Sequence, residues 1–255
     1  MLRSSVIQLG DFTLFSSRAL KTVRRLNRRW GIFLRQCEAI GVTSLGIISV
    51  AGTFMGAVLG YQLYISFKIF GAEALLGGTV GVSLFREMAP VFTAIMVTGR
   101  AGASIAAEIG TMRITEQIDA LEVMAVDPYE FLITPRVTAA VLMMPILALF
   151  FAGIGSLSSA LVACGMMGLD ASIYWDQYAR WVDQIDLIHI LSKSASFGLV
   201  LSLIACYSGF KAQGGAGAVG AATRRTVVLS LLAILLVDYL LTSLLPYRLS
   251  GLVAH

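Results

Sequence analysis

Long apolar stretches dominate the pattern of hydrophobic and polar positions along this chain. No Asp, Glu, Lys or Arg occurs from Ala39 to Phe67, or from Val137 to Leu169. A helix crosses the hydrocarbon core of a bilayer in about 20 residues, so each stretch can span a membrane. Three further apolar stretches carry isolated charges. The pattern predicts five membrane-spanning helices, at about residues 39–67, 75–99, 137–166, 187–210 and 226–245.

The third stretch is longer than a membrane requires. As one helix, residues 137–169 would extend roughly 50 Å, whereas the hydrocarbon core is about 30 Å thick. Such a helix is tilted, or bent, or projects beyond the lipid. If it folds back instead, the number of spans becomes four or six.

The first 36 residues follow a different pattern. Eight of the 19 Lys and Arg residues precede residue 36, namely Arg3, Arg18, Lys21, Arg24, Arg25, Arg28, Arg29 and Arg35. Apolar residues recur between them at helical spacing, at Phe12, Phe15, Ala19, Val23, Leu26, Trp30 and Phe33. This predicts a basic amphipathic helix over residues 1–36 that lies in the lipid headgroup plane, ahead of a membrane domain over residues 37–250. Packing of this helix on the rest of the protein is the alternative. Nucleic-acid binding is disfavoured.

The distribution of basic residues predicts the orientation. With the N-terminus in the cytoplasm, 14 Lys and Arg residues fall in cytoplasmic segments and three in outer segments. Basic residues concentrate on the cytoplasmic side of membrane proteins, so we expect the N-terminus inside. Residues 170–186, which carry four Asp, then form a short acidic excursion on the outer side.

Composition agrees with a membrane protein. The chain is 57% hydrophobic and 13% charged, with a net charge of +4 and a mean hydropathy of +0.83. Soluble domains carry about 25% charged residues, and disordered chains carry more charge and less hydrophobicity. Cys37, Cys164 and Cys206 are too few and too far apart for a disulfide framework. The fold class is therefore an all-α integral membrane protein.

The sequence lacks the patterns of an enzyme. No GxxxxGK[ST] phosphate-binding loop occurs, so this chain does not bind ATP through one. Residues 215–220 match GxGxxG, but no strand precedes them, and a flexible loop is the simpler interpretation. His189 and His255 are the only histidines, and no cluster has metal-ligand spacing.

Four ionisable residues fall within predicted spans. Arg86 and Glu87 interrupt the second span, Lys193 the fourth and Asp238 the fifth. Charges at membrane depth are costly, so they face a partner or a cavity. We expect Lys193 and Asp238 to pair. Arg86 and Glu87 either lie beside a transport route or are neutralised by neighbouring helices.

Two further patterns bear on contacts. Gly52, Gly56 and Gly60 allow close approach of helices, either within the chain or between two copies. Between the second and third spans, Ile114, Ile118, Leu121 and Met124 recur at helical spacing, with Glu116, Asp119 and Glu122 on the other face. This predicts an amphipathic helix of about three turns over residues 113–125, ending near Asp127 because Pro128 follows. It either packs on its own bundle or docks into a groove on a soluble partner.

Residues 84–136, LFREMAPVFTAIMVTGRAGASIAAEIGTMRITEQIDALEVMAVDPYEFLITPR, resemble the MlaE/YrbE family of ABC-transporter permeases. Weaker similarity covers residues 52–62 and 224–243. The resemblance implies a homodimer in the bacterial inner membrane, a separate cytoplasmic ATPase that binds ATP and Mg, an outer MCE-domain lipid-binding protein and a small STAS-domain protein. This chain itself would need no cofactor. The cargo would be phospholipid moved between the inner and outer membranes, which maintains outer-membrane lipid asymmetry.

The resemblance also implies site residues. The lipid cavity at the dimer interface would be lined by Leu59, Leu63, Phe67, Phe70, Arg86 and Glu87. The ATPase-coupling residues would be Glu108, Arg113, Ile114, Glu116, Ile118, Asp119, Leu121, Glu122, Met124 and Asp127. A secondary transporter driven by an ion gradient is the alternative, but it needs ionisable residues along a path and usually an internal repeat, and neither is evident.

Overall fold

The computed structural model describes residues 2–22 and 30–245 of the chain, and every element in these residues is helical. The α-helices are α1 (Leu2–Thr22), α2 (Trp30–Ile40), α3 (Leu45–Lys68), α4 (Leu76–Ser83), α5 (Ala89–Val97), α6 (Ala103–Ile114), α7 (Gln117–Val123), α8 (Thr134–Ala160), α9 (Ala171–Trp181), α10 (Gln184–Phe210) and α11 (Gly215–Leu244). Short 3-10 segments are η2 (Val42–Ser44) and η3 (Glu73–Leu75). The π-helical segments are η4 (Leu84–Met88), η5 (Thr98–Gly102), η6 (Tyr129–Ile133) and η7 (Leu161–Met166).

Five helical runs in the described residues are long and apolar enough to cross a membrane. They are Trp30–Lys68, Glu73–Ile114, Tyr129–Met166, Gln184–Phe210 and Gly215–Leu244. The prediction of an all-α membrane protein with five spans is confirmed. The long third stretch is one continuous helical run with Pro145 inside it, so it does not fold back.

The spans differ in how much of their surface the chain itself covers. About half of the central apolar window is buried in the second, third and fourth spans, but only 22% in the first and 11% in the fifth. The side chains left exposed on α3 and α11 are largely aliphatic or aromatic, including Phe54 and Leu232. Such faces are suited to lipid or to another protein surface, and not to water.

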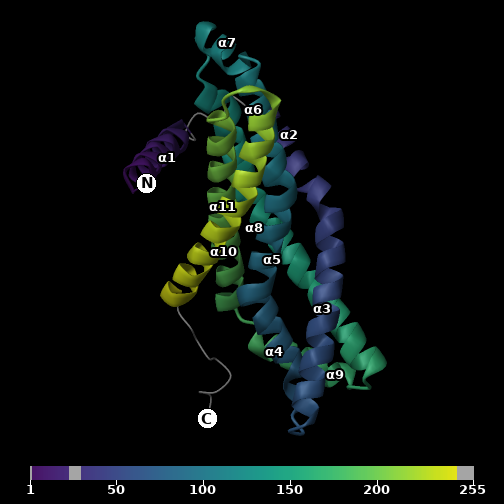
Figure 1. Ribbon diagram of the computed structural model, residues 1–255. Helices are drawn as coiled ribbons and strands as arrows, with labels where there is room; N and C mark the ends of the chain where they lie inside the picture. The colour runs from purple at the N-terminus through teal and green to yellow at the C-terminus, as the bar shows by residue number, and fades with distance from the viewer. Residues whose placement is uncertain (1, 23–29, 246–255) are drawn as a thin grey trace. The chain divides into compact units, whose positions relative to one another are not determined.

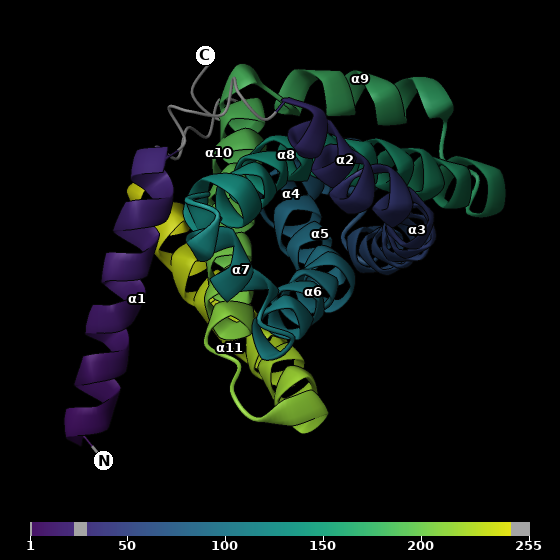
Figure 2. The same cartoon turned by 90° about the horizontal axis from the view of Figure 1, so that it is seen from above.

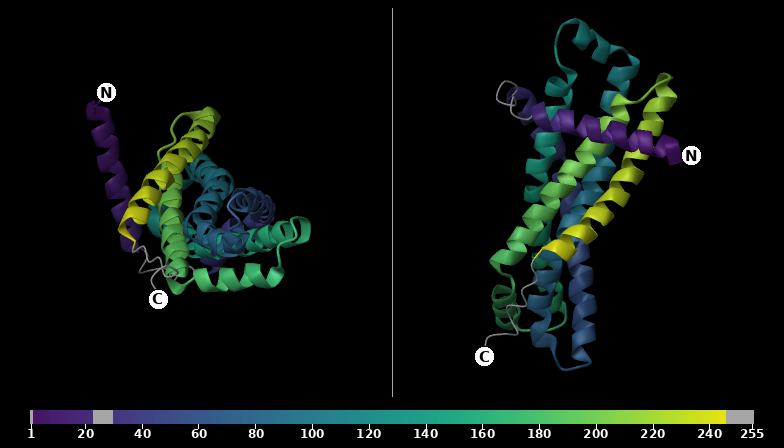
Figure 3. Two further views of the ribbon diagram at one scale, coloured as in Figure 1. Left: turned by 90° about the horizontal axis from the view of Figure 1, so that it is seen from below. Right: turned by 90° about the vertical axis from the view of Figure 1, so that its left-hand side faces the viewer.

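The N-terminal region differs from the prediction of one helix over residues 1–36. Helix α1 ends at Thr22, and α2 runs from Trp30 to Ile40, so the expected boundary at residue 36 falls inside a helix. The part of the predicted helix that contains Val23, Leu26 and four of the arginines lies outside the described residues. The Phe12 and Phe15 rings of α1 pack on Tyr207 of α10, at centroid distances of 5.3 and 5.5 Å. Figure 3 shows α1 crossing the C-terminal end of α10. These contacts attach α1 to the end of α10, and the position of the helix in the lipid headgroup plane stays a prediction.

The chain divides into two compact units. One comprises Met1–Ser44, Val97–Met143 and Ser196–Leu235, and the other comprises Leu45–Met96, Met144–Ala195 and Leu236–His255. The first unit contains α1, α2, α6, α7 and the pocket described below. The second contains α3, α4, α9 and the four ionisable residues that the sequence places within spans, namely Arg86, Glu87, Lys193 and Asp238.

Small residues set the contact between α3 and α8 in the second unit. The buried face of α3 is Ile48, Gly52, Gly56, Gly60 and Tyr64. A Cβ atom on Gly56 would lie 2.1 Å from the carbonyl oxygen of Gly155. The two backbones are therefore in direct contact, and the glycine repeat serves packing within one chain.

Helix α9, which the sequence did not predict, packs on α4 in the same unit (Figure 1). A Cβ atom on Gly77 would lie 2.0 Å from the carbonyl oxygen of Tyr174, so only glycine allows this approach. Asp170 caps α9 by accepting a hydrogen bond from the Ser172 amide at 2.7 Å. The bonds from Ser172 lower the pKa of Asp170 because they favour its charged form.

The contact between α3 and α8 generates a prediction about stability. Gly56→Ala should lower the melting temperature of the detergent-purified protein by several degrees, because overpacking typically costs about 1–3 kcal/mol. The control is Gly153→Ala on α8, where an added Cβ meets nothing within 4 Å. Equal melting temperatures for the two variants would contradict the close packing.

Candidate functional site

The π-helical segment η4 places two charged side chains of the second span within the apolar bundle. Its Arg86 is almost fully buried, and its Nε atom donates a hydrogen bond to the fully buried carboxylate of Asp186. Asp186 lies in the first turn of α10 and also accepts a bond from the Asp183 amide at 2.9 Å. A carboxylate is favoured there because the amino-terminal end of a helix carries partial positive charge.

Glu87 belongs to a second group of charges centred on Lys193 of α10. The Lys193 ammonium is fully buried and lies 2.7 Å from Glu87 Oε2, 2.6 Å from Thr242 Oγ1 and 3.0 Å from Asp238 Oδ1. The ammonium donates hydrogen bonds to Glu87 and Thr242, and it forms an ion pair with Asp238. The predicted pairing of Lys193 with Asp238 is confirmed.

These contacts bear on the choice left open for Arg86 and Glu87. Both side chains have an oppositely charged partner on the fourth span, Asp186 for Arg86 and Lys193 for Glu87, as the second of the two alternatives expects. Asp186, which the sequence analysis did not single out, is the partner of Arg86. Asp186 is the last acidic residue before the fourth apolar stretch, and this position could have identified it in the sequence as a partner for a basic residue of a span.

The other predicted cavity residues lie on or beside α3. Leu59, Leu63 and Phe67 recur every four residues and are partly exposed, next to the buried glycine face. Phe70 follows the end of α3 and is largely exposed. The structure therefore places Leu59, Leu63 and Phe67 on one side of α3. Arg86 and Glu87 instead form ion pairs with Asp186 and Lys193.

The helix between the second and third spans is shorter than the predicted one. Instead of one helix over residues 113–125, α6 ends at Ile114 and α7 runs from Gln117 to Val123. Glu116 lies between them with a φ of 59°, a left-handed conformation that interrupts the helix. Arg113 Nη1 and Asp119 Oδ1 are 2.6 Å apart and connect the two helices across this break. Figure 2 shows α6 and α7 as separate, neighbouring helices.

The break divides the predicted apolar face of this segment. Ile118 is fully buried against its own chain, whereas Val123 and Met124 are 88% and 64% exposed. Ile118 thus holds α7 in place and does not present its side chain to a partner. Val123, which the sequence analysis did not name, projects outward together with the exposed acidic residues Glu116, Asp119 and Glu122.

Three of the predicted coupling residues have contacts within the chain that support this segment. Glu108 Oε2 lies 3.1 Å from Arg136 Nη2, and Asp127 accepts a bond from the Tyr129 amide at 2.9 Å. The Arg113 guanidinium lies 5.7 Å from the centre of the Phe210 ring. Phe210 also packs on Phe15 and Tyr129, so the end of α6 at Arg113 lies beside a cluster of aromatic rings.

No group of three or more His, Cys, Asp and Glu residues that could hold a metal ion occurs in the described part of the chain. Cys37, Cys164 and Cys206 are free thiols.

The buried ammonium generates a prediction. Lys193→Met should strongly reduce the yield and melting temperature of the purified protein, because it leaves two carboxylates without their cation at a typical cost of about 3–5 kcal/mol. Lys193→Met combined with Glu87→Gln and Asp238→Asn should recover much of the loss. Lys68→Met, at an exposed lysine, is the control. Normal stability of the single Lys193 variant would contradict the structural role of these charges.

Comparison with known proteins places the chain in a family. The model of the family "Permease MlaE" matches residues 33–244. A probable ABC transporter permease protein of Rickettsia conorii is 42% identical over 92% of this chain and 91% of its own length. The intermembrane phospholipid transport system permease protein MlaE of Haemophilus influenzae is 37% identical over 92% of this chain and 90% of its own length. The chloroplastic protein TRIGALACTOSYLDIACYLGLYCEROL 1 of Arabidopsis thaliana is 38% identical over 84% of this chain and 61% of its own length. This chain belongs to the MlaE permease family.

Proposed function

We propose that this chain is the membrane-spanning permease subunit of an ABC transporter that moves phospholipids between the inner and outer membranes of a bacterial envelope, and so maintains outer-membrane lipid asymmetry. The observation that carries the proposal is the family match across residues 33–244, which contain the second to fifth spans completely and all of the first span except residues 30–32. The chain has no phosphate-binding loop of its own, so ATP and Mg are bound by a separate ATPase subunit.

The exposed end of α7 is the proposed docking site for that ATPase. Val123 and Met124 form a small apolar tip, and Glu116, Asp119 and Glu122 surround it with negative charge. A short helix of this kind fits a groove with an apolar floor and basic rim. Arg113 of α6 contacts Asp119 of α7, and Arg136 at the start of α8 contacts Glu108 of α6.

The lipid cavity is proposed to form between two copies of the chain. The apolar faces of α3 and α11 are the least covered of the five spans, and a second copy is the partner we assign to them. Leu59, Leu63 and Phe67 would line the cavity and contact acyl chains. Because Arg86 and Glu87 already have ionic partners, we propose that they stabilise the helices around the cavity and do not bind the lipid headgroup.

The proposed mechanism is mechanical. Binding of ATP would bring the two ATPase subunits together and move α7 with them. Because α7 lies between α6 and the helical run that begins with η6, and Arg113 of α6 contacts Asp119 of α7, these helices would tilt, narrow the cavity and expel the lipid. An MCE-domain protein on the outer side would exchange lipid with the cavity, and a small STAS-domain protein would join the ATPase on the cytoplasmic side, where we place the N-terminus.

Docking is tested by changing the exposed end of α7. Val123→Asp combined with Met124→Asp should abolish co-purification of the ATPase and leave the yield of the membrane protein unchanged, because both side chains are exposed. Ile173→Asp, at an exposed position of α9, should retain the ATPase. Undiminished co-purification with the α7 variant would refute the docking role.

The cavity is tested by the amount of phospholipid that co-purifies with the complex. Leu59→Asp combined with Phe67→Asp should lower the bound phospholipid several-fold, because acyl chains gain about 0.8 kcal/mol per buried CH₂ only in apolar surroundings. Leu59→Met with Phe67→Leu keeps the surface apolar and should retain the lipid. Equal lipid content in both variants would rule out these residues as the lining. Lipid movement driven by a proton gradient without ATP would contradict the proposed energy source.

A further inference from the structure

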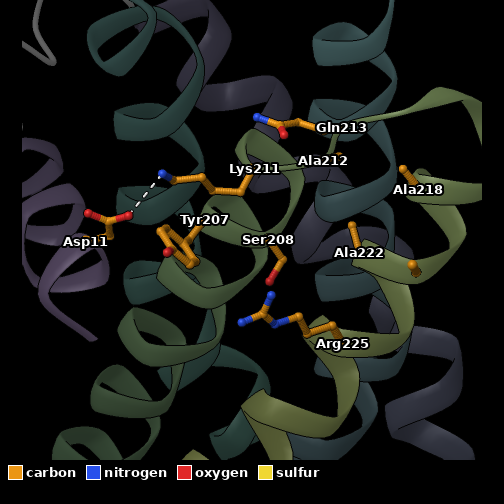
Figure 4. A pocket seen from close by; sticks show the side chains of 10 residues that line it. Asp11, Tyr207, Ser208, Lys211, Ala212, Gln213, Ala218, Ala222 and Arg225 are labelled. Atoms are coloured by element: carbon orange, nitrogen blue, oxygen red, sulfur yellow. Dashed lines mark hydrogen bonds and ion pairs between the residues drawn. The ribbon is translucent and has the colours of Figure 1, made fainter. Parts of the chain in front are cut away.

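A second, polar pocket lies in the first unit, on elements that the proposed lipid cavity does not use. It has a volume of about 570 Å³ and is walled by α1, the C-terminal end of α10 and the beginning of α11 (Figure 4). Its lining residues are Asp11, Tyr207, Ser208, Lys211, Ala212, Gln213, Ala218, Ala221, Ala222 and Arg225. We propose that this pocket binds the phosphate group of a phospholipid headgroup.

Charge is the first argument for a phosphate ligand. Lys211 and Arg225 are the two cations of the lining, and Asp11 is its one carboxylate, so the pocket carries a net positive charge. Lys211 Nζ and Asp11 Oδ2 are 3.3 Å apart, and both side chains are about half exposed. An exposed pair of this kind is worth at most about 1 kcal/mol, so the ammonium is free to turn toward an anion.

The second argument is a buried hydroxyl group without a partner. Ser208 is 8% exposed, and its Oγ atom has no hydrogen-bond partner in the described structure. Figure 4 shows the hydroxyl directed toward the guanidinium of Arg225. Burying a hydroxyl without a hydrogen bond is unfavourable, and a phosphate oxygen between Ser208 and Arg225 would satisfy it.

The start of α11 forms another wall of the pocket. Gly214 and Gly215, with φ values of 91° and 69°, form the turn into this 30-residue helix. Ala218, Ala221 and Ala222 keep this side of the pocket open. Of the GxGxxG-like residues 215–220, the pocket lining includes Ala218.

Helix α1 points to a lipid as the source of the phosphate. While Phe15 and Ala19 are buried, Leu14 and Leu20 project outward on the same helix as the exposed cations Arg18 and Lys21. Exposed leucines beside basic residues are typical of a helix at the level of lipid headgroups. Because α1 contributes Asp11 to the wall, the pocket faces the layer in which lipid phosphates are concentrated.

The test uses the full chain, purified in mild detergent with the subunits that accompany it, and dioctanoyl phosphatidylglycerol as the probe in native mass spectrometry. Lys211→Gln combined with Arg225→Gln should weaken binding of the probe about tenfold, because charge-assisted hydrogen bonds to the phosphate are lost. Arg224→Gln combined with Lys68→Gln removes two exposed cations that do not line the pocket, and should leave the affinity unchanged. Equal affinities for the two variants would overturn the proposal.

Two further measurements separate the site from its alternatives. Ser208→Ala should weaken binding about threefold without lowering the melting temperature of lipid-free protein, because it removes a hydroxyl that has no partner there. Unchanged binding by this variant would overturn the role of Ser208. Dioctanoylglycerol, which lacks the phosphate, should not compete with the probe. If glycerol 3-phosphate binds as tightly as the lipid, the assignment to a lipid headgroup is wrong. Because neither α3 nor α7 is altered in these variants, ATPase co-purification should stay normal, and the outcome is independent of the proposed transport function.

Discussion

The burial of charge inside an apolar helical bundle is the constraint on which the second unit depends. Lys193, Arg86, Glu87, Asp186 and Asp238 come from three different spans, and none could remain ionised in lipid alone. Each is stable only where the helices bring it to an opposite charge. The pairs therefore select one arrangement of the second, fourth and fifth spans over others that would pack equally well by hydrophobicity. This explains why residues that resemble a transport pathway in the sequence are bound to their own chain in the structure.

Small residues act on the same unit in a complementary way. The contacts of Gly56 with Gly155, and of Gly77 with Tyr174, bring backbones together where lipid offers no hydrophobic drive for association. This close packing uses one face of α3 and leaves its other face apolar and exposed. The surface available to lipid or to a second copy is therefore a consequence of where the glycines lie.

In the first unit, aromatic packing supports the end of α6, and the buried Ile118 holds the short helix α7 against its own chain. Phe15, Tyr129 and Phe210 form a cluster of rings beside Arg113, and Arg113 contacts Asp119 of α7 across a left-handed Glu116. Burial of Ile118 leaves Val123 and Met124 as the apolar side chains of the exposed tip.

Sequence alone determined the fold class and the five spans, because the length and hydropathy of a span are local properties of the chain. It also determined the pairing of Lys193 with Asp238, because a buried charge needs an opposite charge and few were available in the spans. The segment over residues 84–136 was also sufficient to indicate a family, since the order of its residues is specific. Tertiary structure decided which side of each helix packs on the rest of the chain and which side stays exposed. Whether Ile118 faces inward, whether Asp186 meets Arg86, and whether Ser208 lines a pocket depend on neighbours that are distant in sequence. The physical reason is that periodicity shows that a helix has two faces, but only packing against other helices determines what each face contacts.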